Sequence, residues 1–192
     1  MLHDLVLEAA DVRLVPLDES HAAPLAALVD DSLWRGMTSP TPQTPAEMLA
    51  TIDAAHAAPG RLSFAVLDAT TGEVRGSTSF YDWAPAFARV EIGHTYYGRA
   101  WWGGATNPAC KLALLTHAFE TWGCERVALR ADAENARSIA AIQRLGGVPE
   151  GVLRSHRVRP DGSRGDTAYF SILAPEWPAV RAGLEARLAA SR

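Results

Sequence analysis

Residue types that commonly build metal and redox sites are scarce in this 192-residue sequence. It holds two cysteines, Cys110 and Cys124, and they do not form a Cys-x-x-Cys pair. Its six histidines are scattered, without a His-Glu-x-x-His motif or the His/Cys spacings of metal sites. We therefore expect no metal site, and we interpret the cysteines as half-buried thiols without a redox role.

Positive charge is limited as well. Lysine and arginine together number 18 against 22 acidic residues, which gives a formal net charge of −4. Lysine occurs once, as Lys111. Because the chain offers no broad basic field, we expect no general binding of nucleic acid.

Long apolar runs are also missing. No stretch approaches the roughly 20 apolar residues that a membrane helix needs, and the N-terminal MLHDLVLEAADVRL carries acids where a signal peptide needs positive charge. These features predict a cytoplasmic protein without membrane contact. With 48% hydrophobic residues, no repeat and no linker, residues 1–192 are predicted to form a single domain.

What the sequence does contain is a succession of β-branched runs and helical spacings. The strands are predicted at 12–17, 61–68, 73–83, 88–97, 125–132, 150–159 and 164–173. The helices are predicted at about 18–31, 45–58, 107–122, 135–145 and 175–190. The strand–helix–strand unit over 88–132 requires one parallel pair inside an otherwise antiparallel sheet.

The segment WWGGATNP (101–108) joins a predicted strand to a predicted helix. Gly103 and Gly104 let a backbone pass close to a ligand, because no Cβ stands in the way. Asn107 followed by Pro108 is typical of a helix cap and first helical position, and a helix N-terminus attracts phosphate. Taken alone, the segment fits a simple turn before a capped helix as well as a phosphate-binding loop.

The order of the motifs resembles the GNAT superfamily of N-acyltransferases, and most of all its RimJ/RimL-like branch. The resemblance is strongest over residues 88–178 and is carried by EIGHTYY, WWGGATNPACKLALLTHAFE, RVALRADAENARSIAAIQRLGG, EGVLRSHRVRPDG and SRGDTAYFSILAPEWP. It implies an α+β fold with a single, mostly antiparallel sheet of about seven strands flanked by helices. The one parallel pair would form a CoA-binding cleft.

The resemblance also implies a site for acetyl-CoA. The pyrophosphate would lie on the loop made by Trp102, Gly103, Gly104, Ala105, Thr106 and Asn107. The pantetheine arm would bind the backbone around Gly93, Thr95 and Tyr96, with Asn135 as a side-chain partner. Ala105 stands where the family prefers glycine, and Ala109 stands where many relatives have glutamate. We interpret Lys111 as a solvated charge on the helix face.

Three residues are the candidates for catalysis by this resemblance. Ser138 is the expected proton donor to the leaving thiolate, or else a first-turn serine of a capped helix. Glu91 is the first candidate for the general base, directly or through water, and His94 is the second. Glu91 fits equally well as a structural partner of Arg89 or Arg130.

Four residues are candidates for lining the acceptor site: Trp34, Trp83, Phe87 and Arg154. Core or lid packing explains the three aromatic residues equally well. In ideal strand phase, Arg154 and His156 would share one face of the last hairpin, with Arg157 and Arg159 on the other. One of these basic faces could meet an acidic substrate or the 3′-phosphate of CoA, but a solvated hairpin balanced by acids is the simpler interpretation.

The implied function is an acetyl-CoA-dependent N-acetyltransferase acting on a primary amine, either a protein N-terminal α-amino group or a small-molecule amine. Attack would be direct, in a ternary complex, because neither cysteine occupies a site that demands a nucleophile. Two alternatives are a non-catalytic module that binds acyl-CoA and an acyltransferase that uses another donor, such as succinyl-CoA. A homodimer is also possible.

Overall fold

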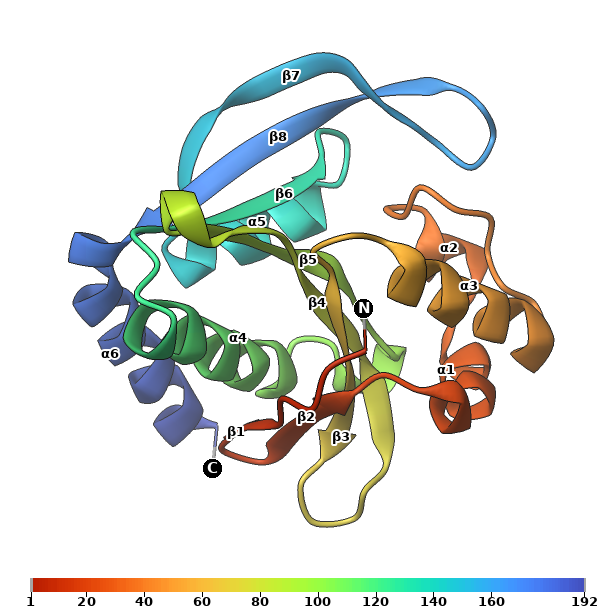
Figure 1. Cartoon of the computed structure of the whole chain (residues 1–192), viewed down its shortest axis with the longest axis horizontal. Helices are drawn as coiled ribbons and strands as arrows, with labels where there is room; N and C mark the ends of the chain where they lie inside the picture. Colours follow the sequence, from red (N-terminus) through yellow and green to blue (C-terminus); the bar gives the residue numbers. More distant parts are fainter. Residues whose placement is uncertain (1, 192) are drawn as a thin grey trace.

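The alternation of apolar residues along the chain produces one mixed sheet of eight strands with helices on both faces (Figure 1). The computed structural model describes residues 2–191. The strands are β1 (Leu7–Ala9), β2 (Val12–Pro16), β3 (Leu62–Asp68), β4 (Val74–Ala84), β5 (Arg89–Tyr97), β6 (Arg126–Asp132), β7 (Val148–Val158) and β8 (Arg164–Leu173). The α-helices are α1 (Ala22–Leu28), α2 (Asp31–Trp34), α3 (Pro45–Ala57), α4 (Thr106–Thr116), α5 (Ala136–Leu145) and α6 (Trp177–Ala190).

The strand order is β1-β2-β3-β4-β5-β6-β8-β7, and only β5 and β6 pair in parallel. The predicted α+β class, with its single parallel pair, is therefore confirmed. The sequence patterns missed β1, which adds an eighth strand, and the separate short helix α2. Both are only three or four residues long, too short to show a period of their own.

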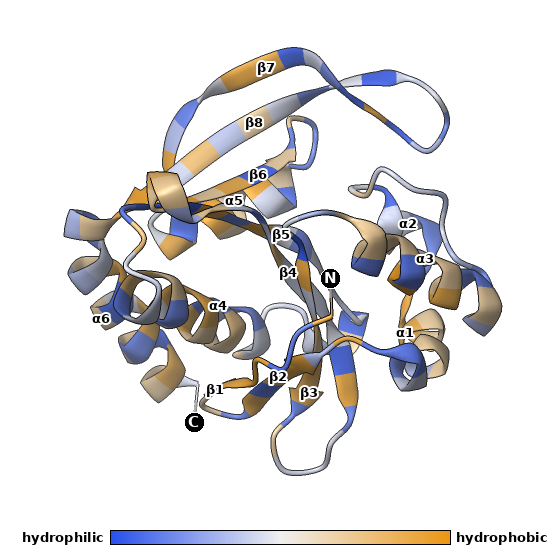
Figure 2. Cartoon of the chain, in the orientation of Figure 1, coloured by the Kyte–Doolittle hydropathy of each residue, from blue (hydrophilic) through white to orange (hydrophobic). Residues whose placement is uncertain are grey.

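Each face of the sheet has its own apolar cluster, because successive side chains of a strand point to opposite faces. On β3, Phe64 and Val66 join the cluster under α4 and α6, which also contains Leu114. Ala65 lies between them and joins the cluster under α1 and α3, where Ile52 is fully buried. Figure 2 shows the hydrophobic residues concentrated in the central strands and in the helices that face them.

The two parallel strands separate after a short stretch of pairing. Only residues 89–92 of β5 pair with β6, through Ile92 opposite Leu129, although β5 continues to Tyr97 and β6 to Asp132. A β-bulge starts where the pairing stops: Ser79 of β4 is opposite Gly93, but Ser77 is opposite Tyr96. The extra residue in β5 bends the strand away from β6 and opens a gap in the sheet.

The helices on either side of this gap begin differently. Asn135 caps α5, as predicted, because its Oδ1 accepts the Ser138 N–H at 3.0 Å. The predicted cap at Asn107 is wrong: α4 begins at Thr106, after Ala105, and has no side-chain cap. The Asn107 side chain instead accepts a hydrogen bond from the Tyr97 hydroxyl at 3.3 Å, so the first N–H groups of α4 stay available.

The β7–β8 hairpin extends beyond the other strands at the edge of the sheet (Figure 1). A register shift between Leu153 and Arg157 includes Ser155 at φ +53°. This bulge overturns the predicted strand phase, because His156 and Arg157 now line the same cavity. None of the described helices is both long enough and apolar enough to cross a membrane.

Candidate functional site

A cavity of about 780 Å³ lies where β5 and β6 separate. One wall, which we call the helix side, carries Lys111 of α4, Arg137, Ser138 and Arg144 of α5 and Arg187 of α6. The other wall, which we call the hairpin side, carries Tyr81 of β4, Arg130 and Asp132 of β6 and His156 and Arg157 of β7. Residues 93–97 of β5 form the floor between the two walls.

The β-bulge shapes this floor. His94 adopts φ +48°, a left-handed conformation that few residues other than glycine tolerate, and the strand resumes at Thr95. Gly93 is needed beside it, because a Cβ there would lie 2.7 Å from Cε1 of Tyr81. Beyond the bulge, the backbone of β5 has no hydrogen-bonded partner strand on the β6 side. Its polar groups can bind an extended ligand that takes the place of a strand.

The loop before α4 is open to a ligand. Gly103 has φ +76°, and an added Cβ at Gly103 or Gly104 would meet no protein atom within 4 Å. The loop is held from behind by buried Arg75, which donates to the Thr106 hydroxyl at 3.2 Å and pairs with Asp11 at 2.8 Å. An uncapped helix N-terminus next to two glycines offers backbone N–H groups and a positive dipole end to an anion.

Trp102 connects this loop to α5. Its indole N–H donates to the Tyr97 carbonyl at 2.7 Å, and the Arg137 guanidinium lies over its ring at 3.5 Å from the centroid. Arg99 also lies over the ring, at 4.9 Å, but Arg99 pairs with Asp30. Within residues 2–191, Arg137 has no carboxylate partner, so its charge is available to a ligand in the cavity.

Lys111 is not the solvated charge that we expected. Its residue exposure is 5%, and its Nζ donates to the Thr95 hydroxyl at 3.2 Å, inside the cavity. Burial lowers the pKa of Lys111 to about 8, while neighbouring Cys110 raises it slightly. The sequence pattern failed here because helical spacing could not show that the second turn of α4 faces the gap between β5 and β6.

Asn135 and Ser138 both line the cavity, from the first turn of α5. The loop that follows α2 passes close to them, since a Cβ on Gly36 would lie 2.9 Å from the Asn135 amide nitrogen. Arg157 donates to the Gly36 carbonyl at 2.9 Å and so ties the hairpin to this loop. The loop after α2 and strand β7 therefore meet beside the cavity.

Glu91 is buried on the hairpin side but does not line the cavity. Its Oε2 lies 3.5 Å from Arg130 Nε and has no hydrogen-bond partner among the described residues. Arg130 is held in turn by the Tyr169 hydroxyl at 2.8 Å and lies over the Tyr81 ring at 4.8 Å. The alternative pairing partner named from the sequence, Arg89, pairs with Asp82 instead.

His94 faces the hairpin side, where its ring meets Tyr81 edge-on at 5.1 Å. Burial, together with the positive charges of Arg61, Arg130 and Arg157, lowers the pKa of His94 to about 3. The imidazole is therefore neutral at physiological pH.

Most of the residues proposed for a donor site meet in the cavity, including Gly93, Thr95, Tyr96, Trp102, Gly103, Gly104, Asn107, Asn135 and Ser138. Ala105, at the end of the loop, and Thr106, the first residue of α4, do not line the cavity. Three residues proposed for the acceptor site lie elsewhere. Trp83 stacks on Trp122 at 4.5 Å, Phe87 is 75% exposed in the β4–β5 connection, and Arg154 is exposed on β7. Trp34 is buried against Tyr96 and does not line the cavity.

The patterns missed Tyr81 and Arg137 as residues of the cavity, and they named Arg130 only as a partner of Glu91 and Arg157 only as part of a basic face of the hairpin. Arg137 could have been predicted to lie in the cavity, because it stands between Asn135 and Ser138 in the first turn of α5. The other three depend on strand pairing and on the bulge in β7, which local sequence does not display.

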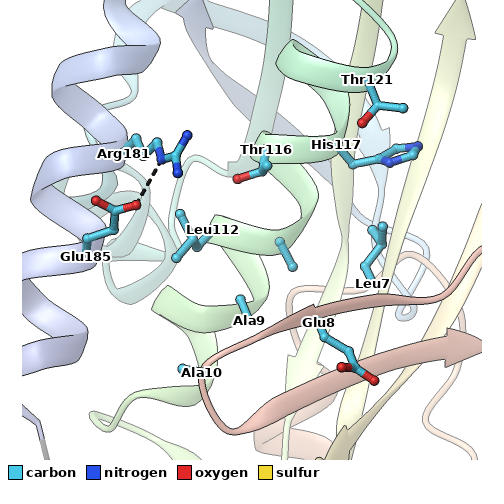
Figure 3. A pocket seen from close by; sticks show the side chains of 11 residues that line it. Leu7, Glu8, Ala9, Ala10, Leu112, Thr116, His117, Thr121, Arg181 and Glu185 are labelled. Carbon is cyan, nitrogen blue, oxygen red and sulfur yellow. Dashed lines mark hydrogen bonds and ion pairs between the residues drawn. The ribbon is translucent and has the colours of Figure 1, made fainter.

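A second cavity, of about 430 Å³, lies between β1, α4 and α6 (Figure 3). Its charged residues on α6, Arg181 and Glu185, pair with each other at 2.9 Å. His117 lines it, and burial lowers the pKa of that imidazole. No group of three or more His, Cys, Asp or Glu that could hold a metal ion occurs among the described residues.

Comparison with known proteins agrees with this geometry. A family model described as "Acetyltransferase (GNAT) domain" matches residues 11–148. YdaF of Bacillus subtilis (strain 168), a candidate ribosomal N-acetyltransferase, is 31% identical over 106 residues. That alignment spans 55% of this chain and 57% of YdaF.

Solved structures share the whole architecture. A candidate acetyltransferase from T. thermophilus is 36% identical, with a TM-score of 0.90 over 98% of this chain and 99% of that chain. Mycobacterium smegmatis RimJ in complex with CoA-disulfide has a TM-score of 0.78 at 22% identity, over 97% of this chain and 94% of that chain. At that identity the likeness to RimJ is one of fold.

Proposed function

The chain belongs to the GNAT family of acetyltransferases, whose fold implies an acyl-CoA donor, and we propose that it transfers an acetyl group from acetyl-CoA to a primary amine. One observation carries the proposal. The parallel strands β5 and β6 separate at a bulge that contacts α4 through Thr95 and Lys111, and the uncapped N-terminus of α4 borders the same cavity, so an open strand edge and an anion site share one cavity.

The residues of the helix side fit such a donor. Gly103, Gly104 and the start of α4 would hold the pyrophosphate through backbone N–H groups, and Arg137 would add a charge-assisted hydrogen bond. The open edge of β5 would bind the amides of the pantetheine arm. An N–H of the bulge would polarise the thioester carbonyl, where negative charge develops when an amine attacks.

Transfer is direct in this proposal, without an acyl-enzyme. The amine nitrogen bonds to the carbonyl carbon, the carbon–sulfur bond breaks, and the sulfur leaves with the electron pair and takes up a proton. Neither cysteine competes as a nucleophile, because burial raises the pKa of both thiols, that of Cys110 to about 11. Ser138 lies in the cavity and would protonate the thiolate.

A base must take the proton that the amine loses. Glu91 is a buried carboxylate with one oxygen free of hydrogen bonds, but it does not line the cavity, so it would act through water. His94 does line the cavity, but its low pKa makes it the weaker base. We therefore keep Glu91 as the first candidate.

Glu91→Gln should lower kcat by about 10²-fold, which lies within the usual contribution of a general base. The loss should be larger for a lysine-like amine than for an α-amino group, because the α-amino group has a pKa near 8 and is partly neutral already. Steady-state kinetics with both amines measures this difference. Equal kcat in wild type and variant would assign Glu91 to a structural pair with Arg130.

The acceptor proposal is a protein N-terminal α-amino group or a small-molecule amine. The name of YdaF supports the first. The direct experiment mixes the protein, acetyl-CoA and a panel of N-terminal peptides and small amines, and it measures thiol release. Release with at least one amine is expected, with the acetyl group found on that amine by mass spectrometry. CoA binding without release for any amine would contradict the proposal and would favour a non-catalytic acyl-CoA-binding module.

A further inference from the structure

The only lysine of the chain is buried in the cavity. Lys111 has 5% exposure, and within residues 2–191 its ammonium has no carboxylate partner. Its one hydrogen-bond partner is the Thr95 hydroxyl at 3.2 Å, and that hydroxyl also interacts with the Thr78 hydroxyl at 2.8 Å. A buried ammonium without a counter-charge is costly, so a fold that keeps one has a use for the charge.

The position of Lys111 indicates that use. Thr95 belongs to the bulge of β5, where the strand leaves β6. On the same helix side, α5 contributes Ser138 and Ile142 to the cavity. A ligand arm that enters at Gly103 and follows the open edge of β5 passes Thr95, so it brings its reactive end past the ammonium.

The pyrophosphate is a poorer explanation for this lysine. The anion site is formed by the loop before α4 and by residues 106–107, whereas Lys111 lies more than a helical turn further along. Arg137 is the unpaired cation beside that loop, above Trp102. Lys111 therefore serves a part of the donor that is neutral in the ground state and gains negative charge during the reaction.

We propose that Lys111 is a catalytic residue, whose ammonium stabilises the negative charge that forms on the thioester as the amine attacks and the carbon–sulfur bond breaks. The inference rests on the proposed acetyl transfer. Lys111 is unchanged at the end of the reaction: the acetyl group moves to the amine, and the electron pair of the broken bond leaves on sulfur. In the unliganded protein the buried charge is destabilising. The interaction between the ammonium and the thioester becomes strong only in the transition state, when negative charge develops.

The first test is Lys111→Met, which keeps the apolar stem and removes the charge. We expect kcat to fall by about 10²-fold, the usual cost of removing one group that stabilises an oxyanion. The Kd for CoA, measured by calorimetry, should stay within about threefold, because ground-state binding does not use the charge. Tm should stay equal or rise, because a buried unpaired charge has been removed.

Lys111→Arg restores a positive charge at the same position. It should recover part of the lost kcat, even though its larger head does not fit ideally. A purely structural lysine would give the opposite pattern, with a lower Tm in the methionine variant and kcat unchanged.

A second measurement does not depend on turnover. Because Lys111 is the only lysine, an amine-directed acylating reagent can modify only this side chain and the N-terminal amine, and peptide mass spectrometry separates the two. With a pKa near 8, Lys111 should react at pH 8.5 in the free protein. CoA should protect it, while the N-terminal amine serves as the internal control.

Three outcomes would overturn the assignment: kcat within threefold of wild type in Lys111→Met, a loss of CoA affinity as large as the loss of kcat/KM, or unchanged labelling of Lys111 in the presence of CoA. Each leaves the proposed acetyl transfer standing if wild type still releases thiol. Absence of thiol release by wild type would instead remove the proposed function, and the role of Lys111 with it.

Discussion

The two sides of the cavity hold their positive charges in different ways. On the hairpin side, Arg130 has Glu91 at 3.5 Å and Arg157 has Asp132 at 3.6 Å. On the helix side, none of the four described cations, Lys111, Arg137, Arg144 and Arg187, has a carboxylate within ion-pair distance. Charges that are paired within the protein are balanced and fix the shape of the wall. Unpaired charges remain for a ligand. The phosphates of acyl-CoA can balance the arginines, whereas Lys111 is left for the charge that forms on the thioester.

The contrast predicts that removing a charge on the hairpin side affects folding most. Asp132 is buried and accepts hydrogen bonds from Arg159 Nε at 3.0 Å and from the Glu134 N–H at 2.9 Å. Asp132→Asn leaves two arginines without their shared partner and should lower the free energy of unfolding by about 3 kcal/mol. Urea denaturation measures the loss.

The control for this variant is Glu185→Gln, which removes an exposed pair on α6 and should cost under about 1 kcal/mol.

The same prediction has a pH dependence. Burial raises the pKa of Asp132, but its hydrogen bonds with Arg159 and the Glu134 N–H, together with the charges of Arg157 and Arg159, have the larger effect, so the pKa lies below its ordinary value. The stability that it contributes is present above its unfolded pKa of about 4 and is lost as the pH falls below that value. The difference in the free energy of unfolding between wild type and Asp132→Asn should therefore shrink as the pH falls below about 4. Equal stability of the two proteins at pH 7 would contradict the pairing of Asp132 with Arg157 and Arg159.

The second prediction concerns the loop on the helix side. A Cβ on Gly104 would touch no protein atom, so Gly104→Val should fold normally and project into the space of the ligand. We expect the Kd for CoA to rise by about 100-fold, equivalent to losing one strong hydrogen bond to a charged group. Ala105→Gly should change it little. Calorimetry checks both, and equal small effects would mean that the loop is a turn without a ligand.

Arg137 provides the third and smaller effect. Arg137→Met removes one unpaired charge above Trp102 and should weaken CoA binding by about tenfold, with a shallower dependence on salt. Arg13→Met, on the exposed surface of β2, is the matched control and should bind CoA as wild type does. A loss of affinity that does not depend on salt would assign the effect to packing against Trp102.

The fourth prediction is a pH-dependent change in stability. The pKa of Lys111 is about 8 in the folded protein and about 10.5 ordinarily, so between these values the unfolded chain binds more protons. Stability of wild type should therefore rise with pH through this window, relative to Lys111→Met. Two neighbours stay protonated there, because burial raises the pKa of Cys110 to about 11 and that of Tyr97 well above its ordinary value. A gap in Tm that stays constant from pH 8 to 10 would contradict the burial of an unpaired ammonium.

Much of the fold followed from local patterns. Alternation located seven of the eight strands, and the strand–helix–strand unit gave the parallel pair. Asn135 was recognised as a cap, because a cap needs only a few neighbouring residues. Asn107 was not a cap, because its side chain is taken by Tyr97, which the pattern before the helix did not show.

The site was less accessible to sequence reasoning. The residues of the loop and of α5 are close in sequence and could be named together. The sequence reasoning assigned three residues to the acceptor site because of the segments that contain them: Trp83, Phe87 and Arg154. None of the three lines the cavity. The bulge around Ser155 adds two residues to β7 between Leu153 and Arg157, and the strand alternation read from the sequence could not show that it brings His156 and Arg157 to the same cavity.

The sequence by itself determined the order of the elements, the glycine loop before α4 and the presence of a single lysine, because these depend on local chemistry and composition. Only the tertiary structure decided which charges are balanced. Burial and pairing depend on groups far apart in the chain, such as Arg157 with Gly36 or Lys111 with Thr95. The solvated lysine expected from helical spacing is instead a buried, unpaired ammonium, because the separation of β5 and β6 turns its face of α4 toward the cavity.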